Sequence, residues 1–186
     1  MRIGYQGIEG SNSENAAKIL SKELKLSNIE LIPLITSANV VKELNLKNID
    51  YGVMAIENTI GGPVEETKNA LIDMNISVLE EVSVQIHHCI FKKYEISINS
   101  IRNVASHIQA LTQCSKNIEK LFPNCNIIET EDTSIAAKYL KEGILSDNTA
   151  VICSKSAGNA SNLELISENI EDNSNNYTTF GIYKLI

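Results

Sequence analysis

Apolar and polar positions along this chain form short blocks of two kinds. Compact apolar runs are typical of strands covered on both faces, whereas apolar residues at helical spacing indicate helices. Because the two kinds alternate, the pattern predicts helices packed on mostly parallel sheets. We expect strands over 2–5, 29–34, 50–56, 76–91, 104–107, 126–129, 149–153 and 178–186, and helices over 14–24, 37–44, 64–71, 109–122, 134–140 and 154–160.

A break near Ser77 to Leu79 divides the chain into two similar runs of alternating strands and helices. We therefore expect two αβ lobes with a cleft between them. The final strand is predicted to return to the first lobe. Lobe 1 would comprise residues 1–77 and 177–186, and lobe 2 residues 78–176.

The corner Glu57-Asn58-Thr59 has the clearest functional pattern. It follows the predicted strand over 50–56 and precedes Pro63, which suits the first position of a helix because proline has no N–H to leave unpaired. Ligands of open α/β sheets bind at the carboxyl ends of strands, and a helix N-terminus attracts anions. A polar loop that merely caps the helix would give the same pattern.

Polar residues gather at other predicted strand-to-helix corners too, including the turn over 9–13 and the segment 106–109. Such a site would be rich in hydroxyls and amides but poor in strong acids and bases, which suits hydrogen bonding to an oxygen-rich anion. The glycine turn lacks the nucleotide fingerprints. His87 and His88 would point to opposite faces of a strand and cannot share a metal, so we expect structural roles and no metal site.

The composition limits the kinds of partner that the protein is expected to bind. The formal net charge of −7 argues against nucleic acid and anionic membranes, and 43% apolar residues suffice for a core. No secretory signal and no apolar run of membrane-spanning length is visible. The four widely spaced cysteines are expected to be free thiols. We therefore expect a cytoplasmic protein and, by default, a homodimer.

Five stretches resemble prephenate dehydratases, in that family's order and over nearly the whole chain. His88 also falls where the family has a strand histidine. The stretches are residues 5–13, Ile56-Glu57-Asn58-Thr59, Ser106-His107-Ile108-Gln109-Ala110, Asp132-Thr133-Ser134-Ile135-Ala136-Ala137 and Asn176-Tyr177-Thr178-Thr179-Phe180.

The resemblance implies lobes like those of type II periplasmic binding proteins and a reaction without a cofactor. Prephenate would lose its ring hydroxyl as water and its ring carboxylate as carbon dioxide, giving phenylpyruvate for phenylalanine biosynthesis. Thr178 would be the catalytic proton donor. The implied substrate-binding residues are Glu57, Asn58, Thr59, Ser106, Gln109, Thr133, Thr179, Phe180, Ser11, Ser13 and Asn176.

The chain departs from the family pattern at three places. Thr179 replaces the arginine of the Thr-Arg-Phe signature, and Asn12 and Glu14 replace the usual Phe and His. No phenylalanine-sensing ACT domain is visible. An alternative is therefore a dehydratase-like protein that binds or senses a small carboxylate, or that decarboxylates prephenate without aromatising it. The sequence leaves open whether a lysine such as Lys155 replaces the missing positive charge.

Overall fold

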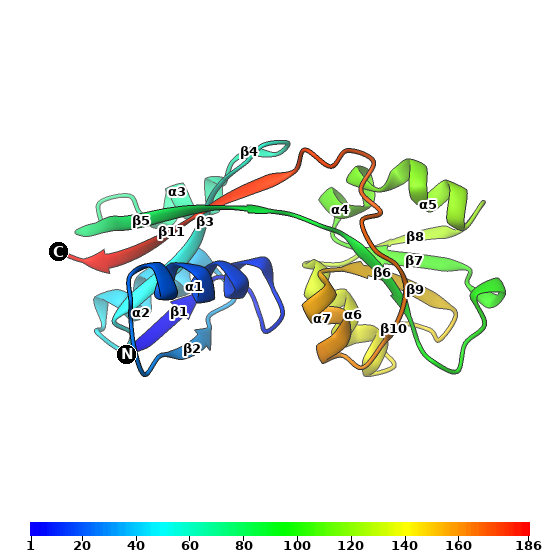
Figure 1. Ribbon diagram of the computed structural model, residues 1–186, viewed down its shortest axis with the longest axis horizontal. Coiled ribbons are helices and arrows are strands. Elements are labelled where there is room, and N and C mark those ends of the chain that lie inside the picture. The colour runs from blue at the N-terminus through cyan, green and yellow to red at the C-terminus, as the bar shows by residue number, and fades with distance from the viewer. The chain divides into compact units, whose positions relative to one another are not determined.

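The computed structural model describes residues 1–186, which form two α/β units (Figure 1). Unit 1 comprises residues 1–8, 12–86 and 175–186, and unit 2 comprises residues 9–11 and 87–174. The two expected αβ lobes are therefore present. The main crossing from unit 1 to unit 2 lies after Ile86 rather than after residue 77, because the strand that follows residue 75 pairs along its length with the last strand of the chain.

The sheet of unit 1 has the order β2-β1-β3-β11-β5, and β4 pairs with the outer part of β3. Strands β2, β1 and β3 are parallel, whereas β11 runs antiparallel to both of its neighbours. The return of the last strand to the first unit is thus confirmed. The strands are β1 (Arg2–Tyr5), β2 (Glu30–Pro33), β3 (Tyr51–Asn58), β4 (Gly62–Pro63), β5 (Ile76–Gln85) and β11 (Tyr177–Leu185).

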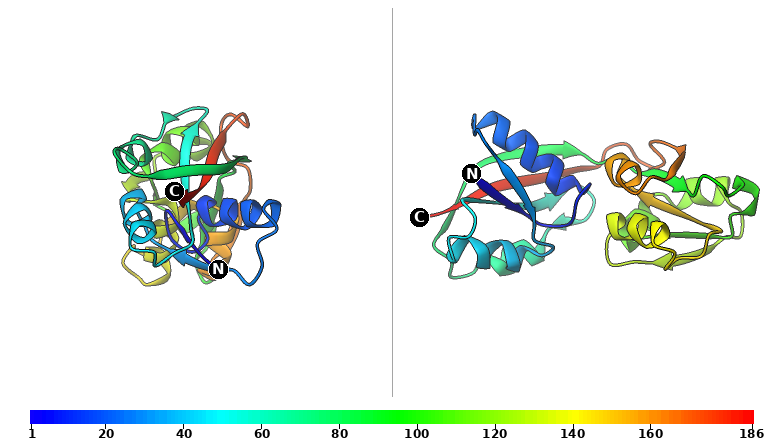
Figure 2. Two further views of the ribbon diagram at one scale, coloured as in Figure 1. Left: turned by 90° about the vertical axis from the view of Figure 1, so that its left-hand side faces the viewer. Right: turned by 90° about the horizontal axis from the view of Figure 1, so that it is seen from below.

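Helices cover both faces of this sheet, as the views of Figure 2 show. Helix α1 (Asn12–Glu23) packs on one face, where Leu20 meets Val53 and Ile182 in a buried cluster. Helices α2 (Ser37–Asn45) and α3 (Glu65–Ala70) cover the other face, in a second cluster that contains Met54 and Tyr183. Adjacent residues of β3 thus enter opposite clusters, as strand geometry requires.

The sheet of unit 2 has the order β10-β6-β9-β7-β8. Its parallel part is β9-β7-β8, and β6 and β10 complete it in antiparallel pairings. Two buried clusters show that α4 and α5 cover one face, and α6 and α7 the other. The elements are β6 (Cys89–Lys92), a 3-10 helix (Ile98–Ser100), β7 (Asn103–Ser106), α4 (Ile108–Gln113), α5 (Ser115–Leu121), β8 (Asn126–Glu129), α6 (Thr133–Lys141), β9 (Thr149–Cys153), α7 (Lys155–Ala160) and β10 (Glu164–Ser167).

Three expectations need correction. The sheets are mixed rather than mostly parallel, because β11, β5, β6 and β10 all pair antiparallel. Pro63 does not begin a helix; it lies in β4 opposite Glu57, and α3 starts two residues later. The helix expected over 109–122 is broken at Cys114, so α4 and α5 are separate.

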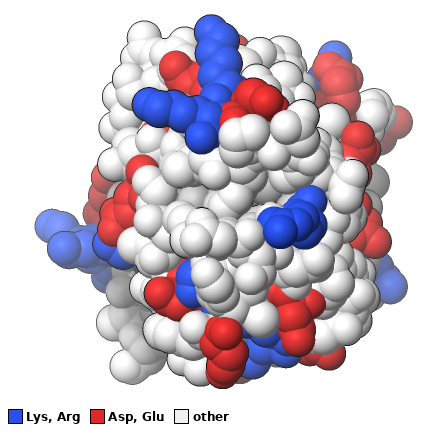
Figure 3. Space-filling model, turned by 90° about the vertical axis from the view of Figure 1, so that its right-hand side faces the viewer, with Lys and Arg blue, Asp and Glu red and all other residues white.

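The surface of unit 2 that faces the viewer in Figure 3 carries acidic and basic side chains side by side. No field of one sign covers it. None of the helices combines the length and the apolar character that crossing a membrane requires.

Gly158 offers a test of packing in unit 2. A Cβ at this position would lie 2.3 Å from Cζ of the fully buried Phe91. Gly158→Ala should therefore lower the free energy of unfolding by about 1–3 kcal/mol through overpacking. Urea unfolding measures this loss. In a double-mutant cycle, Phe91→Leu should recover part of it, and strictly additive losses would contradict the proposed contact.

Candidate functional site

The side-chain amide of Asn58 is a hydrogen-bonding hub at the end of β3. Its Nδ2 donates to Asn176 Oδ1 (2.8 Å), the Tyr177 carbonyl (3.1 Å) and Thr178 Oγ1 (2.9 Å). Its Oδ1 accepts from the backbone N–H groups of Ile60 (3.0 Å) and Gly61 (2.8 Å). The hub therefore joins the β3–β4 turn to the start of β11, although Asn58 and Thr178 are 120 residues apart.

Thr59, the residue after Asn58, also forms hydrogen bonds to the segment that leads into β11. Its Oγ1 donates to the Asn175 carbonyl (3.2 Å) and accepts from the Tyr177 N–H (2.9 Å), and its own N–H donates to the Tyr177 carbonyl. Asn176 is only 1% exposed. The expected substrate-binding residues Asn58, Thr59 and Asn176 thus do meet, but their polar groups hold the backbone and Thr178.

Thr178 and Thr179 face opposite sides of the unit 1 sheet. Thr178 pairs with Asn58 and Val84, and its side chain lies on the face that α1 covers, together with Phe180. Thr179 pairs with Glu57, and its Oγ1 lies 2.9 Å from Ser83 Oγ. Directly opposed residues of antiparallel strands share a face. The expected set is therefore split, with Glu57 and Thr179 on the face away from Thr178.

Of the candidates in unit 2, only Gln109 has an exposed side chain. Ser106 is completely buried, and its hydroxyl donates to the Ile152 carbonyl (2.6 Å). Thr133 begins α6, whose N-terminus is already capped by the Asp132 carboxylate. Next to it, the buried hydroxyl of Ser134 has no hydrogen-bond partner.

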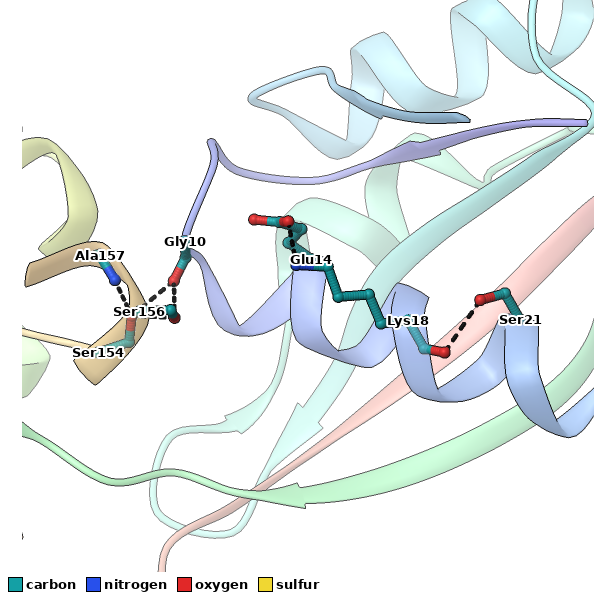
Figure 4. A network of polar contacts seen from close by, with 7 residues as sticks. All are labelled: Gly10, Glu14, Lys18, Ser21, Ser154, Ser156 and Ala157. Atoms are coloured by element: carbon teal, nitrogen blue, oxygen red, sulfur yellow. Dashed lines mark hydrogen bonds and ion pairs between the residues drawn. The ribbon is translucent and has the colours of Figure 1, made fainter. Parts of the chain in front are cut away.

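The tip of the β1–α1 turn is held within unit 2. The hydroxyls of Ser154 and Ser156 both donate to the Gly10 carbonyl, at 2.6 and 2.9 Å (Figure 4). Gly10 has φ +83°, and a Cβ there would lie 2.7 Å from Cα of Ala157, so this approach requires glycine. The turn also carries the candidate Ser11, which is buried.

Beyond this tip the chain re-enters unit 1. The candidate Ser13 lies buried in the first turn of α1, followed by the Glu14–Lys18 ion pair visible in Figure 4. From the sequence, Lys155 was a candidate to replace the positive charge of the missing family arginine. Its ammonium group forms an ion pair with Glu168 at 2.7 Å. That pair raises the pKa of Lys155.

The sequence pattern did not predict that the carboxylate of Glu171, in unit 2, would be buried. The Glu171 side chain is 3% exposed, and its oxygens accept from the His88 N–H (2.9 Å) and contact His87 Nδ1 (2.8 Å). Burial by itself raises the pKa of Glu171, but these donors outweigh burial and hold the pKa below its ordinary value. The His88 ring in turn meets Gln113 Oε1 (2.8 Å), and burial lowers its pKa. The clue in the sequence was the paired histidines.

Histidine, cysteine and carboxylate side chains nowhere gather into a group that could hold a metal ion. All four cysteines are free thiols, and burial is the main reason that their pKa values are raised. Reactive cysteines need the opposite environment. The chemistry that remains at the strand ends is therefore hydrogen bonding by amides and hydroxyls.

The fold and this site define a class of two-unit α/β proteins with mixed sheets. A periplasmic substrate-binding protein from Coxiella burnetii shares the fold at a TM-score of 0.53 (10% identity, covering 99% of this chain and 84% of that one). Prephenate dehydratase from Arthrobacter aurescens, in complex with L-Phe, is more similar, with a TM-score of 0.88 (20% identity, covering 100% and 60%). A structure described as GqqA, a quorum-quenching acylase, has a TM-score of 0.84 (22% identity, covering 100% and 64%).

The sequence model of the prephenate dehydratase family matches residues 3–184, and the chain belongs to that family. A curated relative is arogenate dehydratase/prephenate dehydratase 2, chloroplastic, from Arabidopsis thaliana. It is 30% identical over 180 residues, which cover 97% of this chain. The chain spans less than half the length of this relative, at 45%.

Glu171 makes a testable contribution to stability. Because its pKa in the folded state is depressed, its stabilisation is complete above the ordinary value of 4.5 and is lost as the pH falls through the folded pKa. Glu171→Gln should therefore cost about 1.5–3 kcal/mol at neutral pH, the usual range for hydrogen bonds to a charged group. Urea unfolding from pH 7 to 3 should show the difference from the parent protein shrinking below about pH 4.5. A difference independent of pH would contradict this assignment.

Proposed function

We propose that this chain carries the catalytic activity of a prephenate dehydratase, a carbon–oxygen lyase that forms phenylpyruvate, water and carbon dioxide. The observation that carries the proposal is the Asn58–Thr178 contact. Asn58 donates to Thr178 Oγ1, and none of the hydrogen bonds in the structure uses the hydroxyl proton of Thr178. Family membership supports the same activity.

The proposed chemistry needs a hydrogen-bond donor because hydroxide is a poor leaving group. As the ring C–O bond breaks, the proton of Thr178 passes to the departing oxygen and forms water. The electron pair of the bond between ring and carboxylate completes the aromatic ring, and carbon dioxide leaves. Thr178 then regains a proton from solvent. The reaction therefore needs no electron acceptor.

The remaining candidates divide by their accessibility. We propose that the exposed Gln109 and the half-buried Thr133 contact the substrate directly. Ser106, Asn176 and Phe180 are buried and would act by fixing the strand ends. Ser11, in the β1–α1 turn, and Ser13, in the first turn of α1, are also buried, and they stay proposed substrate-binding residues. The cytoplasmic location and the homodimer expected from the sequence stay predictions.

Arogenate is a second candidate substrate. The Arabidopsis relative is named for both arogenate and prephenate dehydratase. The two reactions share the loss of ring hydroxyl and carboxylate, so the same proton donor would serve both. We therefore propose that both compounds be assayed.

Thr178→Val provides the direct test. Valine keeps the shape of threonine but has no proton to donate, so kcat should fall at least about 100-fold, the lower range for loss of a general acid. Formation of phenylpyruvate from prephenate measures this at neutral pH, with Thr178→Ser as the control that retains the hydroxyl. Full activity of Thr178→Val would exclude the role of Thr178. Binding without turnover by the parent protein would instead favour the small-carboxylate sensor.

Thr179→Arg tests the departure from the family signature. Since position 179 lies opposite Glu57, the arginine should form a cross-strand ion pair and add about 0.2–1 kcal/mol to stability. The KM for prephenate should then change by less than about twofold, because this face of the sheet lies away from Thr178. Thermal unfolding and steady-state kinetics measure the two effects. A KM lowered about tenfold would mean that residue 179 contacts the substrate carboxylate, as the sequence led us to expect.

A further inference from the structure

We infer that Asn58 is a positioning residue for Thr178 and does not itself contact the substrate; this inference rests on the proposed function. The hydrogen-bonding capacity of the amide is fully used within the protein. Three acceptors surround Nδ2, and two backbone donors surround Oδ1. A substrate oxygen could reach this amide only by displacing one of these partners.

The orientation of the amide follows from its neighbours. The N–H groups of Ile60 and Gly61 can only donate, so the atom that they contact must be the oxygen. The atom facing Thr178 is therefore the nitrogen. This removes the usual ambiguity of an asparagine side chain.

The orientation of Asn58 determines what Thr178 can do. A hydroxyl oxygen that accepts an N–H keeps its own hydrogen for another acceptor. If the facing atom were an oxygen instead, Thr178 would donate to it, and its proton would point away from any substrate. Asn58 thus commits Thr178 to the donor role that protonation of the leaving hydroxyl requires.

Asn58→Asp separates the two functions of the amide. One carboxylate oxygen still accepts from Ile60 and Gly61, so the β3–β4 turn should persist. The other oxygen now accepts the Thr178 proton. We expect kcat to fall at least about 100-fold, the cost of losing the general acid, while KM stays within about threefold.

The pH profile adds a readout that a merely structural role would not move. A carboxyl group facing three acceptors becomes a donor when it is protonated, and it then restores the orientation of Thr178. The ratio of the kcat of Asn58→Asp to that of the parent protein should therefore rise as the pH falls from 8 to 5. A flat ratio would overturn the inference.

Asn103→Asp is a matched control in unit 2. The Asn103 amide is also a hub, with Nδ2 donating to Ser146 Oγ (3.2 Å) and Asn148 Oδ1 (3.0 Å), and Oδ1 accepting from Asn126 (3.2 Å). The same change of charge there should leave kcat, KM and their pH dependence unaltered. Circular dichroism and thermal unfolding establish that each variant folds.

Asn58→Gln serves if Asn58→Asp does not fold. It keeps the amide but displaces it by one methylene, so kcat should fall with KM retained. For either variant, a raised KM with retained kcat would mean that Asn58 binds substrate, and unchanged kinetics would mean that it has no role. Both outcomes overturn the inference. If the parent protein converts neither prephenate nor arogenate, the proposed function itself fails.

Discussion

The insertion of β11 between β3 and β5 is the constraint on which the rest of unit 1 depends. Its backbone is paired on both sides over almost its whole length, so the last residues of the chain lie inside the sheet. This pairing places Thr178 beside Asn58 and sets Phe180 and Ile182 against α1. A shift of one residue in the register would exchange the environments of Thr178 and Thr179.

Polar groups in both units are satisfied largely within the protein. Asn58 and Thr59 bind the segment before β11 at Asn176 and Asn175, and Glu171 binds the backbone that enters β6. Asp172 caps α5 through the N–H groups of Lys116 and Asn117. Burying such groups without partners would be costly. Their arrangement therefore rigidifies the strand ends. The one buried polar side chain without a hydrogen-bond partner, that of Ser134, lies at the start of α6.

The replacement of the family arginine by Thr179 has a local explanation. The threonine hydroxyl meets Ser83 across the strand pair, and Glu57 lies opposite on the other strand. A basic residue at this position would have a carboxylate partner within the sheet. The departure thus changes a cross-strand contact on the face away from Thr178, and it leaves the Asn58–Thr178 pair intact. This is why the altered signature and the proposed activity are compatible.

The sequence by itself determined the alternation of strands and helices, the division into two units and the family, because hydrophobic periodicity and local motifs are properties of neighbouring residues. It also singled out Asn58 and Thr178 as candidate site residues. It could not show that Pro63 would join a hairpin or that β11 would pair antiparallel, since strand partners are chosen by contacts distant in sequence. Nor could it show that Thr178 lies on the face covered by α1 and Thr179 on the other face. It also could not show that the hydrogen-bonding groups of Asn58 are all used within the protein. Those features were decided by the tertiary structure, because the face of a side chain and the number of its partners depend on register.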